Sequence, residues 1–92
     1  MIVALTTDLM DRSKIAGAIP GVAFSLTDDA DVVIVDLARG DVAEVRAALP
    51  SARIVAYGPH VDEAAAIAAR SAGADTVLPR SRFFRDPAAA CR

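Results

Sequence analysis

The hydrophobic residues of this chain fall into short continuous runs, separated by stretches with helical spacing. Strand-like runs cover residues 1–5, 22–26, 32–37, 53–57 and 76–78. The first, third and fourth runs do not alternate between apolar and polar residues, which is typical of strands buried on both faces of a parallel sheet. The pattern therefore predicts an α/β domain with a largely parallel sheet.

Polar residues that can cap helices precede the stretches with helical spacing. Asp8 or Thr7 is expected to cap a helix through residue 18, and Asp41 a second one, with Glu44 three residues further on. Side-chain oxygens at such positions accept hydrogen bonds from the free N–H groups of the first turn. These signals predict two helices with well-defined starts.

A third helix is expected to start at Asp62 or His60 and to end at Gly73. Glycine suits the left-handed conformation that commonly follows a helix. From the spacing we expect the inner face of this helix to consist of small and apolar residues, namely Ala64, Ile67, Ala68 and Ser71.

The connection after the weak strand at residues 22–26 is unusually short. Only residues 27–31 separate it from the next strand, whereas a parallel crossover usually needs a dozen or more residues. Either the chain runs bare across the sheet, or this strand is misplaced or antiparallel. We expect that a helix is missing here and that the sheet stays mostly parallel.

Composition limits the chain to one small domain, residues 1–92. It is 54% hydrophobic and 24% charged, which excludes a disordered chain, and its one cysteine (Cys91) excludes a disulfide framework or a cysteine-based zinc site. No apolar run approaches a membrane span, and the start lacks the basic region of a signal peptide. We therefore expect a cytoplasmic protein with no membrane partner.

The net charge of −2 hides an asymmetry along the chain. Residues 1–75 carry eleven acids and six bases, a net −5, whereas residues 76–92 carry four arginines and one aspartate, a net +3. Residues 82–92 are expected to form a basic tail or a short terminal helix. Nucleic-acid binding usually needs a wide basic face. This basic segment is smaller, so we do not expect nucleic acid as a partner.

Three stretches together resemble a response-regulator receiver domain: VVIVDL at residues 32–37, RIVAYGPH at 53–60 and AIAARSAGADTVLPRS at 66–81. The resemblance implies a three-layer, flavodoxin-like fold with five mostly parallel strands in the order 2-1-3-4-5. It also places Asp36 where receivers carry the aspartate that accepts a phosphoryl group. Against this family the second helix is missing, and the fifth is short or absent.

The chain departs from the receiver pattern at the residues that support phosphorylation. Thr6 and Thr7 stand where receivers have a Mg²⁺-binding acidic pair, with Asp8 the one acid nearby. Gly58 replaces a switch hydroxyl, and Arg80 stands in the region of a lysine. An acyl phosphate needs cations to offset its charge. We therefore expect a non-enzymatic pseudo-receiver without metal or cofactor, which acts by protein–protein interaction.

The candidate residues all belong to the carboxyl edge of the predicted sheet, where open α/β proteins bind ligands. They are Thr6, Thr7, Asp8, Asp36, Gly58, His60 and Arg80. For Asp36 we favour a carboxylate bonded to backbone N–H groups or paired with Arg80, and for His60 a helix cap or a surface residue. The alternatives are a phosphoryl-accepting receiver that uses Asp36, and a small anion- or nucleotide-binding protein.

The shortened helical cover also predicts an interface. A parallel sheet needs both faces covered, and exposed apolar patches mark interaction sites. We expect a homodimer or a partner complex that involves Phe83, Phe84, Ile15 and Ile19. The alternative for the phenylalanines is that one ring fills the core beneath the sheet, in place of a fifth helix.

Overall fold

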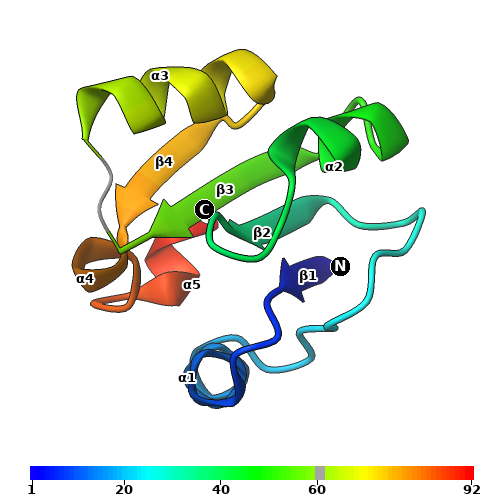
Figure 1. Ribbon diagram of the computed structural model, residues 1–92. Coiled ribbons are helices and arrows are strands. Elements are labelled where there is room, and N and C mark those ends of the chain that lie inside the picture. Colours follow the sequence, from blue (N-terminus) through cyan, green and yellow to red (C-terminus); the bar gives the residue numbers. More distant parts are fainter. Residues whose placement is uncertain (60–61) are drawn as a thin grey trace.

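The fold is a parallel sheet with helices on both faces (Figure 1). The computed structural model describes residues 1–59 and 62–92. The four strands are β1 (Ile2–Leu5), β2 (Val32–Asp36), β3 (Arg53–Gly58) and β4 (Thr76–Pro79), and they pair in parallel in that order. The predicted α/β class and parallel sheet are therefore confirmed.

Two layers of helices cover the sheet. The helices are α1 (Leu9–Ala18), α2 (Val42–Ala48), α3 (Glu63–Ala72), α4 (Arg80–Phe83) and α5 (Pro87–Ala90). Helices α2 and α3 pack on the face that carries Val33 and Val35, whereas α1, α4 and α5 pack on the face that carries Ile34. Because side chains alternate between the faces of a strand, the continuous run at residues 32–36 is buried on both.

The strand expected at residues 22–26 is not present, so the sheet has four strands and this part of the prediction is wrong. Of residues 22–26, only Ala23 pairs with the sheet, as an isolated parallel bridge to Val3 beside β1. Its N–H donates to Ile2 O, and its own carbonyl accepts from Ala4 N–H. Residues 27–31 then lead directly back to the amino ends of the strands, where β2 begins. This short connection leaves too little chain for a longer strand at residues 22–26.

No helix forms in residues 19–31, all of which the structure describes. The missing second helix is therefore confirmed, and α4 and α5, of four residues each, show that the C-terminal helical cover is short. None of the described helices is long and apolar enough to cross a membrane.

The predicted helix starts are confirmed in detail. Asp8, Asp41 and Asp62 are the N-caps of α1, α2 and α3, and each side chain accepts from the backbone N–H three residues on. Gly73 follows α3 with φ of 121°. Such a positive φ is costly for residues other than glycine, so the helix ends where the sequence indicates.

The expected inner face of α3 is wrong. Ile67 is 56% exposed, and the buried position is instead Ala69, with Ala66 and Ala72 partly buried. The helix is built largely from alanine, so its two sides differ little in side-chain size. Contacts with α2 and β4 determine which side faces inward.

Candidate functional site

Asp36 lies at the carboxyl end of β2 and is almost fully buried, with 2% of its surface exposed. Thr6, which follows β1, donates from Oγ1 to Asp36 Oδ2 at 2.8 Å. The N–H of Ala38 donates to Asp36 Oδ1 at 3.0 Å. Both carboxylate oxygens are therefore hydrogen-bonded within the chain. The bond from the Ala38 N–H is of the backbone kind that we favoured for Asp36, whereas the bond from the Thr6 hydroxyl is not.

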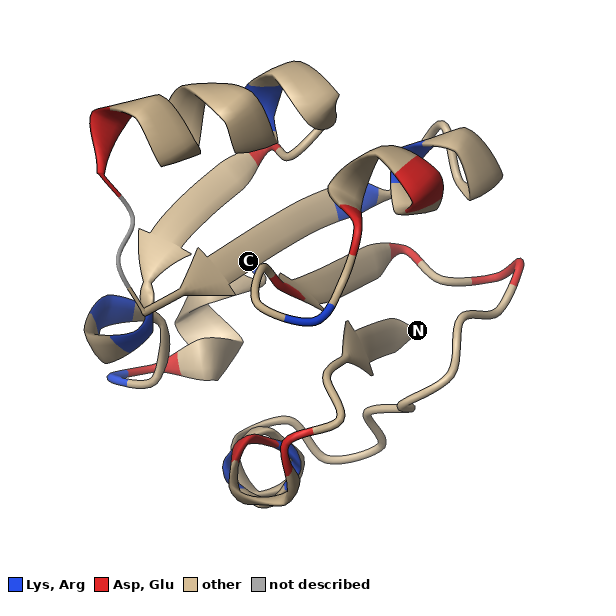
Figure 2. Cartoon of the chain, in the orientation of Figure 1, with Lys and Arg blue, Asp and Glu red and all other residues tan. Residues whose placement is uncertain are grey.

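The cation beside Asp36 is Arg39, not Arg80. Arg39 Nε lies 3.5 Å from Asp36 Oδ2, and its Nη2 lies 3.8 Å from Asp8 Oδ2. Its Nη1 also donates to Thr7 Oγ1 at 3.2 Å. A guanidinium thus stands between the two carboxylates at this edge, and a basic residue is visible in the loop after β2 (Figure 2).

A tight turn after β2 places Arg39. The N–H of Gly40 donates to Asp36 O at 2.7 Å. A Cβ at residue 40 would lie 2.9 Å from Val35 Cγ1 and 3.2 Å from Asp36 O, so the turn requires glycine. Sequence reasoning missed Arg39, although a basic residue three positions after Asp36, followed by glycine, was an available signal.

The other predicted site residues are only partly brought together. Thr6, Thr7, Asp8 and Asp36 form one connected group. Gly58 ends β3 opposite Pro79, and His60 lies outside the described residues. The expected pair between Asp36 and Arg80 does not form, because Arg80 is bound to Asp11.

Asp11, Tyr57 and Arg80 form a second, buried cluster that sequence reasoning missed. Arg80 donates from Nη1 and Nη2 to the two oxygens of Asp11, at 2.7 and 2.6 Å. The Tyr57 hydroxyl donates to Asp11 Oδ2 at 2.9 Å. The side chain of Asp11 is 1% exposed, and that of Arg80 is 35% exposed.

The same contacts set the ionisation of this cluster. The Arg80 hydrogen bonds lower the pKa of Asp11 against the opposing effect of its burial. The bond to Asp11 likewise raises the pKa of Arg80. Burial is the main reason why the pKa of Tyr57 lies above its ordinary value of 10.0. Asp11 and Arg80 are thus both held in their charged forms, whereas Tyr57 is held neutral.

Tyr57 is expected not to ionise while the chain is folded. Because folding raises the pKa of Tyr57, its neutral hydroxyl contributes fully to stability below pH 10. Above pH 10 this contribution declines, because the tyrosine of the unfolded chain ionises at a lower pH than that of the folded chain. Tyr57 is the one tyrosine, and the chain has no tryptophan, so tyrosinate absorbance reports on this residue alone. In the urea-unfolded chain the absorbance should rise near pH 10. In the native chain it should rise at a higher pH, together with a loss of circular dichroism. A native titration near pH 10 without unfolding would contradict this prediction.

The residues expected at an interface lie mostly in the core, and their expected exposure is wrong. Ile15 and Phe83 are fully buried, and Ile19 is 7% exposed. The Phe83 ring stacks on Tyr57 with 4.6 Å between centroids, which agrees with the alternative that it fills the core. Phe84 remains partly buried at the surface, packed edge-on against both rings.

A scan of known protein families and a search of curated proteins found no match to this chain. Solved structures do match. A response regulator from Burkholderia pseudomallei, described with a phosphorylated aspartic acid, a calcium ion and citrate, aligns with a TM-score of 0.78 and 19% identity. The chain has the fold of a response-regulator receiver domain. The alignment covers 99% of this chain and 65% of that one, so this receiver-like chain spans about two thirds of its neighbour.

Two further neighbours agree on the receiver-like fold. A response regulator from Thermotoga maritima aligns with a TM-score of 0.70 and 15% identity, over 86% of this chain and 82% of that one. RcsB from Salmonella enterica serovar Typhimurium, bound to promoter rprA in the presence of phosphomimetic BeF3⁻, aligns with a TM-score of 0.68 and 20% identity. That alignment covers 98% of this chain and 65% of the other.

Proposed function

We propose that this receiver-like chain is a regulatory module that acts by protein–protein interaction and does not depend on phosphorylation of Asp36. The observation that carries the proposal is the state of that carboxylate. Asp36 is buried, accepts hydrogen bonds from Thr6 and Ala38, and has the Arg39 guanidinium 3.5 Å away. A phosphoryl donor would have to displace these partners before an oxygen of Asp36 could attack it.

The electrostatics of the site support the same proposal. Phosphoryl transfer to a carboxylate gathers negative charge, which bound cations offset in receivers that carry an acidic pair. Here Arg39 supplies a fixed positive charge between Asp8 and Asp36. Among the described residues, no three Asp, Glu, His or Cys side chains gather closely enough to hold a metal ion. The guanidinium would also repel Mg²⁺ at this position.

Incubation of the chain with acetyl phosphate and Mg²⁺ tests the proposal, with intact mass as the measurement. A receiver with a complete acidic site serves as the positive control for the reagents. We expect no phosphoryl adduct on this chain. An adduct that is lost in Asp36→Asn would overturn the proposal and favour the alternative, a phosphoryl-accepting receiver that uses Asp36.

The role of Arg39 can be tested through the double variant Thr7→Asp/Arg39→Ala. It places an acid beside Asp8 at an exposed position, as the third acid of the site with Asp36, and removes the positive charge. We therefore expect Mg²⁺ to bind at least about tenfold more tightly than to the unmodified chain. Isothermal titration with MgCl₂ is the measurement. Thr7→Asp paired with Arg82→Ala, which removes an exposed arginine from α4, is the matched control. Equal gains in both double variants would show that Arg39 does not exclude the metal ion.

A further inference from the structure

A hollow of about 680 Å³ runs beside α2, where the helical layer over the sheet is incomplete. One wall is α2, and the other is the stretch that includes Phe24 and Leu26, while Leu5 lies between them. We call this hollow the α2 trough. We propose that the α2 trough is a docking site for an amphipathic α-helix of a partner protein. This inference rests on the proposed function and names the surface that would carry it.

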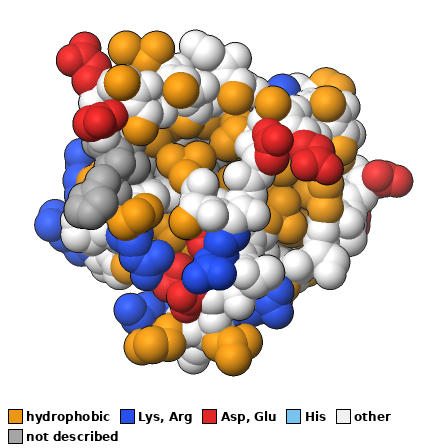
Figure 3. Space-filling model, viewed as in Figure 1, with side chains coloured by type: hydrophobic (Ala, Val, Ile, Leu, Met, Phe, Trp, Pro, Cys, Tyr) orange, Lys and Arg blue, Asp and Glu red, His pale blue; other side chains and the backbone are white. Residues whose placement is uncertain are grey.

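The lining of the α2 trough explains why an apolar helix face would bind there. Leu5, Phe24, Leu26, Val45 and Ala48 give it a largely apolar surface. Leu26 is 39% exposed, and neither Leu5 nor Phe24 is fully buried. Hydrophobic side chains are visible in the hollowed surface beside α2 (Figure 3). A parallel sheet needs cover on both faces, and residues 19–31 supply no helix here.

The shape of the α2 trough favours a helix over a compact ligand. A second hollow of about 460 Å³ shares Ala48 with the trough and continues past the end of α2, as far as Pro50 and Ala52. The two hollows thus follow α2 and the turn after it. Because α2 itself has seven residues, a helix of roughly ten to twelve residues, at about 1.5 Å per residue, would extend beside α2 and the turn after it. An occupant that lies parallel to α2 completes the helical layer.

Charges at the two ends define the direction of the occupant. Arg12 lines the α2 trough at the carboxyl edge of the sheet, where Arg39 also lies but is paired with Asp8 and Asp36. Asp28 lines the second hollow at the opposite edge, where Asp31 also lies but is paired with the amino terminus. Arg12 and Asp28 therefore distinguish the two ends. Acidic residues lie along the stretch between α1 and β2 (Figure 2). The complementary partner is a helix with acidic residues in its first turn and basic residues in its last. Its own dipole favours the same arrangement of charges.

The α2 wall adds a second requirement. Asp41, the N-cap of α2, and Glu44, in its first turn, are exposed and also line the trough. Basic side chains on the flank of the occupant that faces α2 would meet them. The proposed partner helix is therefore apolar on one face and basic along one flank, and it runs antiparallel to the strands.

A synthetic peptide tests the proposal with the full chain labelled for NMR. The probe has about twelve residues and leucines at helical spacing, with acids in its first turn, bases in its last and bases along one flank. A side-chain lactam holds it helical, because isolated helices of this length are marginal. We expect amide shifts confined to the lining of the two hollows, namely residues 5–7, Arg12, residues 23–31 and residues 38–52. A peptide with the two charged ends exchanged should bind about tenfold more weakly.

Two tryptophan variants on α2 are the matched controls. Ala48 and Ala47 are both exposed, but only Ala48 lines the trough. Ala48→Trp fills the trough and should abolish peptide binding, whereas Ala47→Trp should leave it unchanged. Absence of shifts at millimolar peptide, shifts elsewhere on the chain, or binding that survives Ala48→Trp would each overturn the proposal.

Sedimentation of the same variants distinguishes a second copy of this chain as the occupant. A dimer that is retained in Ala47→Trp and lost in Ala48→Trp would mean that another copy fills the trough, which would overturn the partner helix. The acetyl phosphate experiment tests the proposed function independently of the docking site. Phosphorylation of Asp36 with peptide binding intact would overturn only the proposed function, and loss of peptide binding without phosphorylation would overturn only the docking site.

Discussion

Asp11→Ala is expected to lower the free energy of unfolding by about 2–4 kcal/mol. The substitution removes the partner of both Arg80 nitrogens and the acceptor of the Tyr57 hydroxyl. Arg80 is 35% exposed, so water can replace part of the hydrogen bonding that its guanidinium loses. We therefore expect a loss of stability at the lower end of the range for a broken buried ion pair. Urea unfolding followed by circular dichroism measures it. Asp29→Ala, at an exposed aspartate, is the control and should change stability by less than about 0.5 kcal/mol.

Asp11→Asn separates the charge from the hydrogen bonds. The amide oxygen can still accept from Tyr57, so we expect a smaller loss than in Asp11→Ala. The pKa of Asp11 is lowered by folding, so its charged form contributes stability above its ordinary pKa of 3.8, and this contribution is lost as the pH falls below that value. Stability of the Asn variant should therefore decline less steeply under acid. Equal declines in both chains would contradict a role for the Asp11 charge.

The parts of the fold that could be predicted from sequence depend on local interactions. Asp8, Asp41 and Asp62 each bind an N–H three residues away, so the cap and its partner stand together in the sequence. The run at residues 32–36 likewise predicts a strand buried on both faces, because every position before Asp36 is apolar. These signals need no knowledge of how the elements pack.

The residues that were missed depend on contacts between distant parts of the chain. Asp11 and Arg80 are 69 positions apart, and only the packing of α1 and α4 on the same face of the sheet brings them together. The prediction of the inner face of α3 was wrong for a related reason. Ala69 is buried and Ile67 is exposed because of the elements that pack against the helix, and the sequence of α3 does not show them. Arg39 is the exception. It lies three positions after Asp36, and the resemblance to receivers directed attention to Arg80 instead.

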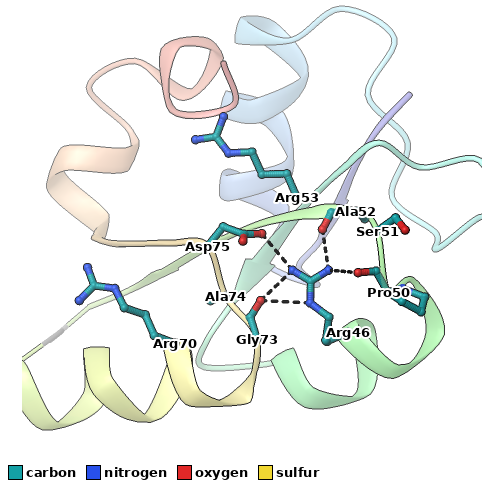
Figure 4. A pocket seen from close by; sticks show the side chains of 9 residues that line it. All are labelled: Arg46, Pro50, Ser51, Ala52, Arg53, Arg70, Gly73, Ala74 and Asp75. Carbon is teal, nitrogen blue, oxygen red and sulfur yellow. Dashed lines mark hydrogen bonds and ion pairs between the residues drawn. The ribbon is translucent and has the colours of Figure 1, made fainter.

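Arg46→Met is the second substitution with a large expected effect, a loss of about 2–4 kcal/mol in the free energy of unfolding. The guanidinium of Arg46 ties the ends of α2 and α3 together (Figure 4). Nη1 donates to Leu49 O, Pro50 O and Ala52 O, while Nε and Nη2 donate to Gly73 O, and Nη2 also pairs with Asp75. Methionine keeps most of the stem and removes every donor, so these carbonyls lose their partner.

Arg70→Met is the matched control for this prediction. Arg70 lines the same hollow and is exposed, and its side chain points away from the carbonyl groups that Arg46 binds (Figure 4). Removal of its charge should change stability by less than about 0.5 kcal/mol. A similar loss of stability in both variants would mean that the positive charge in this region stabilises the chain, and that the hydrogen bonds of Arg46 do not.

A double-mutant cycle with Gly73→Ala shows whether Arg46 and the turn act as one unit. A Cβ at residue 73 would lie 2.8 Å from Arg46 Cγ, and the φ of 121° is itself unfavourable for alanine. Gly73→Ala alone should therefore displace Arg46 from its carbonyl partners and incur backbone strain as well. In the Arg46→Ala background the conflict at Cγ disappears, while the 2.9 Å approach to the Cβ of residue 46 and the backbone strain remain, so the losses should be less than additive. Additive losses would show that the turn after α3 is stable without Arg46.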